Sequence, residues 1–396
     1  MKSFPLAAPA LSSPSGRPRR SAYAGLVLLL ALPACSDPEP EFFDLPADPI
    51  PCEFQYRDVC LHLSYAVARR FSESITIDTS LDDDCARPPL VAEGSPYCIV
   101  AGTTLEIPAD VTVRAIGTRP LVLLASQTIT IDGTLDVSSS REVVIPPQAA
   151  EAIGAGGGTY KGCQSFRRAP EGRPAGGGAG AGGTFAALGG AGGDGNYEDI
   201  PARDLGGLTP FDPEPAPTLL RPGCRGQDGA GAALGARGGR GGPAGGAVYV
   251  AAKAGITING TIAANGAGGM GGGAQAGGGG GGSGGMISLE APTVARNGKL
   301  FANGGGGGEG GIFAAGEVLG ESGADGRQDT MFAAGGASAL PGKGGDGGAR
   351  SRPGGEDGTF TNEAGAGGGG GIGVIRVLGA TTLGPAAVES PAVTVN

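Results

Sequence analysis

The feature that most constrains the fold of this chain is a set of short apolar runs, clearest in residues 120–138. This stretch reads PLVLLASQTITIDGTLDVS, in which the runs LVLLA, TITI and TLDVS are separated by small or polar residues. The second and third runs alternate apolar and polar residues, which is the two-residue period of a β-strand. The sequence therefore predicts three short strands joined by tight connections.

The same pattern recurs along the chain. At an offset of 24 residues (122 − 98 = 24) six apolar positions align, namely Cys98, Val100, Leu105, Ile107, Val111 and Val113 with Val122, Leu124, Ile129, Ile131, Leu135 and Val137. Residues 247–266 and 286–304 repeat the pattern, and there Ile256, Ile258 and Ile262 match Ile129, Ile131 and Leu135. A turn falls at the same place each time, at Asp132-Gly133, Asn259-Gly260 and Asn297-Gly298. A repeat of about 20 residues or more that is built from short strands indicates a stacked solenoid.

Glycine divides the chain into two parts. Of the 83 glycines, 6 occur up to residue 150 and 77 follow, and the later ones form the insertions 139–245, 266–285 and 304–371 between the strand-like segments. Fixing one backbone residue costs about 1–2 kcal/mol, and glycine has no side chain to bury in return. We therefore expect these low-complexity insertions to be surface loops, tight near the strands and loose at their tips, unless they pack backbone to backbone in a polyproline-like form.

The N-terminus has the features of a secretion signal in residues 1–35, with basic residues followed by the apolar segment Ala22–Leu32. The signal ends in Leu32-Pro33-Ala34-Cys35, which resembles the lipobox of bacterial lipoproteins. This resemblance implies cleavage before Cys35, acylation of that cysteine, and a lipid anchor in the bacterial outer membrane, on its surface or its periplasmic side. The alternative is an ordinary signal peptide with a cysteine near its cleavage site.

The charge of the chain limits its partners. Removal of residues 1–34 takes away four positive charges and no negative ones, so the net charge changes from −10 to −14 (−10 − 4 = −14). Nucleic acid is disfavoured as a partner because phosphate binding requires a basic surface. Residues 36–51 hold five prolines and five acidic residues, which predicts an extended tether. The lipid, and not the protein surface, is expected to hold the body at the membrane.

Apart from Cys35 the chain has six cysteines: Cys52, Cys60, Cys85, Cys98, Cys163 and Cys224. An even number of cysteines in an exported chain predicts disulfides, and fifteen pairings are possible. Proximity in sequence favours Cys52–Cys60, Cys85–Cys98 and Cys163–Cys224. No two of them have the close spacing of structural zinc ligands, which disfavours the alternative of a zinc site. We assign residues 52–96 to a cysteine-containing cap over the first end of the repeat.

Residue types that carry catalysis are scarce. His62 is the only histidine and lies between two leucines, which favours a structural role. Residues 189–197 follow a calcium-binding glycine repeat in part, and a second partial copy surrounds Asp346, but such sites are formed between tandem copies. Glu106 could form an acid–base pair with Asp132 or Asp136, although we favour the interpretation that these are outward, solvent-facing charges. We therefore predict no catalytic residue, no metal site and no cofactor.

The spacing of the repeat and its Asn-Gly or Asp-Gly turns resemble the pectate-lyase-like β-helix superfamily and the β-helical adhesins that bacteria secrete. The resemblance covers residues 97–138 and 246–304. It implies an all-β fold over residues 97–396, a right-handed parallel β-helix (solenoid) with long Gly-rich loop insertions. Polysaccharide-cleaving members carry Gly-His-Gly and Arg-x-Lys motifs, and neither occurs here.

These observations together predict a non-enzymatic, lipid-anchored cell-surface protein, structural or adhesin-like, that displays Gly-rich loops. Its expected partners are the membrane and, through the loops, polysaccharide or extracellular matrix. Two alternatives stay open. One is a carbohydrate-active enzyme (polysaccharide lyase or hydrolase) on the same scaffold, and the other is a passive envelope spacer.

Overall fold

The computed structural model describes residues 67–85, 96–142, 150–157, 161–163, 166–173, 176–196, 204–210, 212–232, 235–312, 318–338 and 342–395. The chain divides into two units, Met1–Pro49 and Ile50–Asn396, and every described residue belongs to the second. Several predictions concern residues outside the described ranges: the signal with Cys35, the tether, Cys52, Cys60 and His62.

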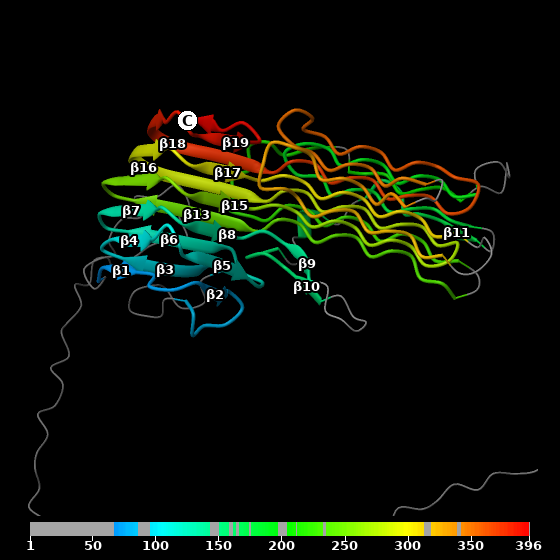
Figure 1. The fold of residues 1–396 in the computed structure, drawn as a ribbon, viewed down its shortest axis with the longest axis horizontal. Helices are drawn as coiled ribbons and strands as arrows, with labels where there is room; N and C mark the ends of the chain where they lie inside the picture. Colours follow the sequence, from blue (N-terminus) through cyan, green and yellow to red (C-terminus); the bar gives the residue numbers. More distant parts are fainter. Residues whose placement is uncertain are drawn as a thin grey trace, which may run out of the picture. The chain divides into compact units, whose positions relative to one another are not determined.

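The described part is all-β (Figure 1). Its strands are β1 (Arg69–Arg70), β2 (Ile75–Asp78), β3 (Cys98–Gly102), β4 (Leu105–Ile107), β5 (Thr112–Ile116), β6 (Leu121–Ala125), β7 (Thr128–Ile131), β8 (Thr134–Asp136), β9 (Ser140–Glu142), β10 (Ala150–Ala152), β11 (Gly172–Arg173), β12 (Gly176–Gly177), β13 (Ala247–Ala252), β14 (Gly255–Ile258), β15 (Thr261–Ala263), β16 (Met286–Arg296), β17 (Lys299–Phe301), β18 (Val374–Leu383), β19 (Val388–Ser390) and β20 (Thr394–Val395). One short 3-10 helix, η2, covers Lys161–Cys163.

Two large sheets of parallel strands contain most of these elements. The 6-stranded sheet has the order β19-β17-β15-β8-β5-β2. The 10-stranded sheet follows the order β1-β4-β7-β14-β16-β13-β6-β3, and β18 and β20 join it beside β16. Because β16 pairs with both β14 and β13, this sheet turns back on itself and is nearly closed, like a barrel. We call β1–β8 together with β13–β20 the strand region.

The predicted right-handed parallel β-helix with Gly-rich loop insertions is wrong. The strands lie in two sheets, the larger of which turns back on itself, and do not form a stack of separate coils. Met286–Arg296 continues as one strand of 11 residues, and Val374–Leu383 continues beside it as one of 10. The first and second runs of the repeat thereby merge. The join is marked by a shift of register between Glu290 and Thr293.

The alignment of individual residues is right for some runs and wrong for others. Ile107 and Ile258 both pair with Ile131, and Ile262 pairs with Leu135, as the repeat predicted. Cys98, however, pairs with Leu121 and not with Val122. In the third run, Val113 pairs with Leu135 and not with Val137. These differences arise because the connections between runs differ in length from one copy to the next.

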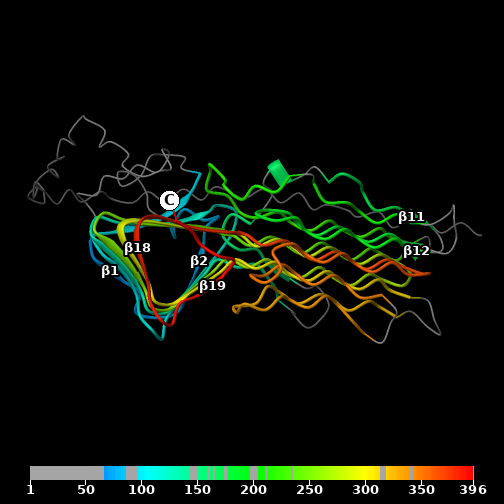
Figure 2. The same ribbon diagram turned by 90° about the horizontal axis from the view of Figure 1, so that it is seen from above.

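Both large sheets face one apolar core. Ile107, Ile131 and Ile258 from one sheet pack in the same cluster as Leu135 and Ile262 from the other. Figure 2 shows the two sheets around this interior. A second cluster covers the outer side of β3, β6 and β13, where Phe185 and Leu220 pack on Val122, Leu124 and Tyr249. The runs LVLLA and AVYVAA are buried at every residue because both of their faces are covered, whereas TITI has one exposed face.

The glycine insertions are not loops. Their described parts run as extended segments side by side next to the strands (Figures 1 and 2), and we call them the glycine bundle: residues 176–196, 204–210, 222–232, 235–246, 264–285, 302–312, 318–338 and 342–373. Hydrogen bonds within the bundle repeat every three residues, which is the period of a polyproline II helix. The described segments therefore pack backbone to backbone in an extended form, which is the alternative to surface loops that the sequence left open.

Residues 277–285 occupy the centre of the bundle. Successive N–H groups of this segment donate in three directions, to carbonyl groups of residues 224–230, 365–371 and 264–270 in turn. Carbonyl groups of the same segment accept N–H groups from three further segments, residues 180–183, 239–245 and 305–308. Backbone polar groups that would be costly to bury unpaired are thus satisfied by neighbouring segments.

Glycine is required in this centre because the segments lie so close together. A Cβ atom on Gly280 would lie well inside 3.0 Å of the carbonyl oxygen of Ala181. Gly281 and Gly282 meet the carbonyl oxygens of Gly305 and Pro243 in the same way. These segments can pack so closely only because glycine has no side chain, the same property that argued against a fixed structure for the insertions.

Within the described residues, two disulfides join segments of the chain. They link Cys85 to Cys98 and Cys163 to Cys224, which are two of the three pairings that proximity in sequence favoured. The turns of the repeat are joined by side chains as well. The Asn297 amide donates to Asn259 at 2.9 Å, and the Asn259 amide donates to Asp132 at 2.7 Å.

Candidate functional site

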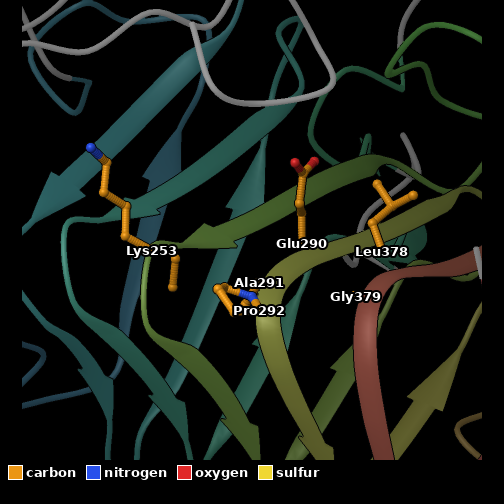
Figure 3. Close-up of a pocket in the computed structure, with 7 residues that line it drawn as sticks. Lys253, Glu290, Ala291, Pro292, Leu378 and Gly379 are labelled. Carbon is orange, nitrogen blue, oxygen red and sulfur yellow. The ribbon is translucent and has the colours of Figure 1, made fainter.

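A hollow in the strand region opens where β13 ends and where β16 and β18 bend (Figure 3). Its volume is about 450 Å³, which is within the range of small-molecule sites. Its lining consists of Ala252, Lys253, Glu290, Ala291, Pro292, Leu378 and Gly379. We call it the glutamate hollow, because Glu290 provides the one carboxylate among these lining residues.

Glu290 is positioned by a buried tyrosine. The hydroxyl of Tyr249 donates a hydrogen bond of 2.6 Å to the Glu290 carboxylate. Tyr249 is fully buried in the second apolar cluster, so its ring cannot easily move. The Tyr249 hydroxyl therefore holds the Glu290 carboxylate in place at the edge of the hollow.

The backbone shapes the rest of the hollow. Gly379 has φ of +117°, a conformation that glycine adopts readily, and this bends β18 next to Leu378. In Figure 3 Lys253 lies at one end and Glu290 with Leu378 at the other, with Ala291 and Pro292 between them. The hollow thus combines one acidic and one basic side chain with an apolar floor.

A second hollow of about 390 Å³ adjoins the first along the same strands. Its lining continues directly from Lys253 to Ala254, from Pro292 to Thr293 and from Gly379 to Ala380. None of its lining residues carries a charge, and the outward side chains that bear hydroxyls are Thr128, Thr130, Thr257, Thr293 and Thr382. We call it the threonine hollow.

The acid–base pairs considered from the sequence do not form a site. Glu106 on β4 makes an ion pair of 2.8 Å with Arg70. Asp136 belongs to the other large sheet, where it pairs with Arg114 at 3.2 Å. Asp132 lies in a turn and accepts the Asn259 amide. Each of these three carboxylates therefore has a partner of its own.

The two partial calcium motifs carry aspartates with structural partners. Asp194 accepts the N–H of Gly206 at 2.7 Å and lies 3.7 Å from Arg168. Asp346 is nearly buried and lies 3.1 Å from Lys343 and 3.5 Å from Arg352. Burial raises the pKa of Asp346, but the N–H of Gly335 and these two cations outweigh burial and hold the pKa below its ordinary value. Within the described ranges no cluster of three histidine, cysteine, aspartate or glutamate residues could hold a metal ion.

The sequence carries one signal for the glutamate hollow, a departure from the apolar repeat at Glu290. Glu290 pairs with Ala251, and Ala251 pairs with Leu124, so a carboxylate occupies a position that is apolar in the two preceding copies. A charged residue inside an otherwise buried run is unusual and points to a site. Tyr249, two residues before Ala251, gave no such signal, because tyrosine is common in buried strands.

Comparison with protein-family models, with curated proteins and with solved structures finds no match for this chain. In the described part of the chain, no helix has both the length and the apolar character that crossing a bilayer requires.

Proposed function

We propose that this protein is a non-enzymatic, lipid-anchored protein of the bacterial cell surface with a structural or adhesin-like role. The observation that carries the proposal is the glycine bundle, because it turns the largest insertions into a packed body whose hydrogen bonds run from segment to segment. Such a body holds its surface in a fixed shape and can present that surface to a polymer or another cell. Anchoring rests on the lipobox-like residues that end in Cys35.

The anchor is tested in cells that carry the full chain, with Cys35→Ser as the matched variant. Growth with an alkyne-labelled fatty acid is expected to label the wild type and not C35S. Protease added to intact cells is expected to degrade the wild type. Lack of label on the wild type would overturn the lipid anchor, and full protection from protease in intact cells would overturn the surface location.

The structural or adhesin-like role is tested by comparing the attachment of cells that carry the protein with that of cells that lack it. Cells that carry the protein are expected to attach more strongly to immobilised polysaccharide or matrix than cells without it. Equal attachment of both would favour the passive spacer instead.

A carbohydrate-active enzyme is the second candidate, and the hollow beside Glu290 is the observation in its favour. Glycoside hydrolysis ordinarily uses two carboxyl groups, about 5–10 Å apart, on either side of the bond that is cleaved. Glu290 is the one carboxylate among the described lining residues of both hollows. Release of reducing ends from a polysaccharide by the purified protein would support the enzyme and overturn the non-enzymatic role.

A further inference from the structure

The glutamate hollow and the threonine hollow form one surface across the bend of the strands. Three stretches of chain pass directly from one hollow to the other: Lys253–Ala254, which connects β13 to β14, Pro292–Thr293 in β16, and Gly379–Ala380 in β18. The two hollows have volumes of about 450 and 390 Å³. A ligand with two or more linked units could therefore occupy both.

The chemistry of the first hollow suits a sugar ring. A sugar has apolar C–H faces, which can pack on Ala291, Pro292 and Leu378. Its edge carries neighbouring hydroxyl groups, which can donate to the Glu290 carboxylate. Because Tyr249 already holds that carboxylate at 2.6 Å, little freedom is lost when a ligand binds.

The chemistry of the second hollow suits the next unit of an uncharged chain. Thr130 on β7 and Thr257 on β14 are direct neighbours across the sheet, so their hydroxyls repeat at the spacing of adjacent strands, about 4.8 Å. Each threonine hydroxyl can donate one hydrogen bond and accept two, as a sugar hydroxyl can. An anionic chain would find no cation among the residues that line this hollow.

We propose that this surface binds a neutral glycan chain, with one sugar ring in the glutamate hollow beside Glu290 and the following ring over the threonine hollow. The proposal deepens the adhesin-like role and rests on it only for access to glycans outside the cell. It names the class of ligand, and the site, that such a role requires.

The test is calorimetric titration of the purified chain with cellohexaose, laminarihexaose and mannohexaose, with a chondroitin sulfate oligosaccharide as the anionic comparison. At least one neutral hexaose is expected to bind. Glu290→Gln is expected to weaken that binding about tenfold or more, because a hydrogen bond to a charged group contributes at least that much. Thermal unfolding of each variant shows whether the fold is intact.

The threonine hollow is tested by a matched pair of double variants. T130V/T257V removes two hydroxyls from the hollow, and T134V/T261V removes two hydroxyls from direct neighbours on the 6-stranded sheet. All four side chains are partly exposed, so the two variants are comparable in burial. The first variant is expected to weaken binding several-fold and the second to leave it unchanged.

Three results would overturn the proposal: binding of none of the neutral hexaoses, preference for the anionic oligosaccharide, or binding that both E290Q and T130V/T257V leave intact. Failure of the proposed function is a separate result. A chain that binds glycan but carries no lipid, or lies inside the cell, keeps this inference and loses the anchored surface role. A surface-anchored chain that binds none of the glycans keeps the anchored surface role and loses this inference.

Discussion

The strand region and the glycine bundle are stabilised in opposite ways. In the strand region, side chains such as Ile131 and Leu135 fill a core, and the backbone bonds lie within the sheets. In the bundle, the backbone itself is the core, and residues 277–285 bond to neighbours on all sides with almost no side chains between them. A buried interior can therefore be formed by packed side chains or by backbone segments that pack closely because they lack side chains.

The two regions therefore differ in the kind of change that harms them. Removal of atoms opens a cavity among packed side chains. Addition of atoms separates segments whose backbones are in contact. The stability of variants in each region therefore tests this difference.

Gly280→Ala is expected to destabilise the protein by more than about 4 kcal/mol, because its Cβ would collide with the carbonyl oxygen of Ala181 and break bonds around the central segment. Gly354→Ala is the matched control, since its Cβ would lie 3.4 Å from the nearest atom, the carbonyl oxygen of Leu188. Chemical denaturation of both variants measures the difference. Equal stability of the two variants would show that the centre of the bundle tolerates side chains. It would contradict the proposed difference between the two regions.

The two disulfides are expected to matter unequally. Cys163–Cys224 spans 61 residues and Cys85–Cys98 spans 13, so the loop-entropy relation gives about 4 and about 3 kcal/mol respectively. The paired variants C163S/C224S and C85S/C98S are compared by denaturant midpoint. A larger loss of stability for C85S/C98S than for C163S/C224S would contradict this order. It would mean that the bundle holds the segment around Cys163 in place without the disulfide.

Ile131→Ala is expected to destabilise the protein by about 3 kcal/mol, because the side chain is fully buried between Ile107 and Ile258. Ile131→Val removes one methylene group and should cost about 1 kcal/mol. Thermal unfolding of the two variants shows how the stability depends on the volume of side chain that is removed. If both variants matched the wild type, the strand region would not depend on a packed core.

Acid is expected to weaken the bundle through Asp346. Its pKa is lowered in the folded protein, so the stabilisation is complete above the ordinary aspartate value, about 3.9, and is lost as the pH falls through the folded pKa. Asp346→Asn removes this dependence. The free energy of unfolding of the wild type should therefore fall more steeply than that of D346N between about pH 4 and pH 2, and parallel curves would contradict the assignment.

Some of the fold was open to prediction from particular residues. The alternation in TITI and GITI placed Ile129, Ile131, Ile256 and Ile258 on one buried face, and they share a core. The uninterrupted apolar runs LVLLA and AVYVAA are buried on both faces, as such runs favour. The Asp-Gly and Asn-Gly turns aligned with one another, and their side chains are bonded.

The candidate site was less predictable. Glu290 breaks an apolar pattern and could have been noticed, but its partner Tyr249 lies 41 residues earlier and reaches it only because β13 and β16 are neighbours. The threonine hollow depends on β18, whose place beside β16 no nearby residue indicates. Contacts between distant segments depend on which strands pair and in which register. The repeat predicted these pairings only in part.

The repeating strands, their apolar faces and their turns could be predicted from the sequence alone, because they depend on local periodicity, whereas the sequence only favoured the two disulfide pairings. Only the tertiary structure decided how the runs merge into two sheets and how the glycine segments pack. Runs of glycine have no side chains to set a register, so any segment could in principle lie against any other. The strands fix where each insertion leaves and rejoins the sheets, and the hydrogen bonds between segments determine the packing within the bundle.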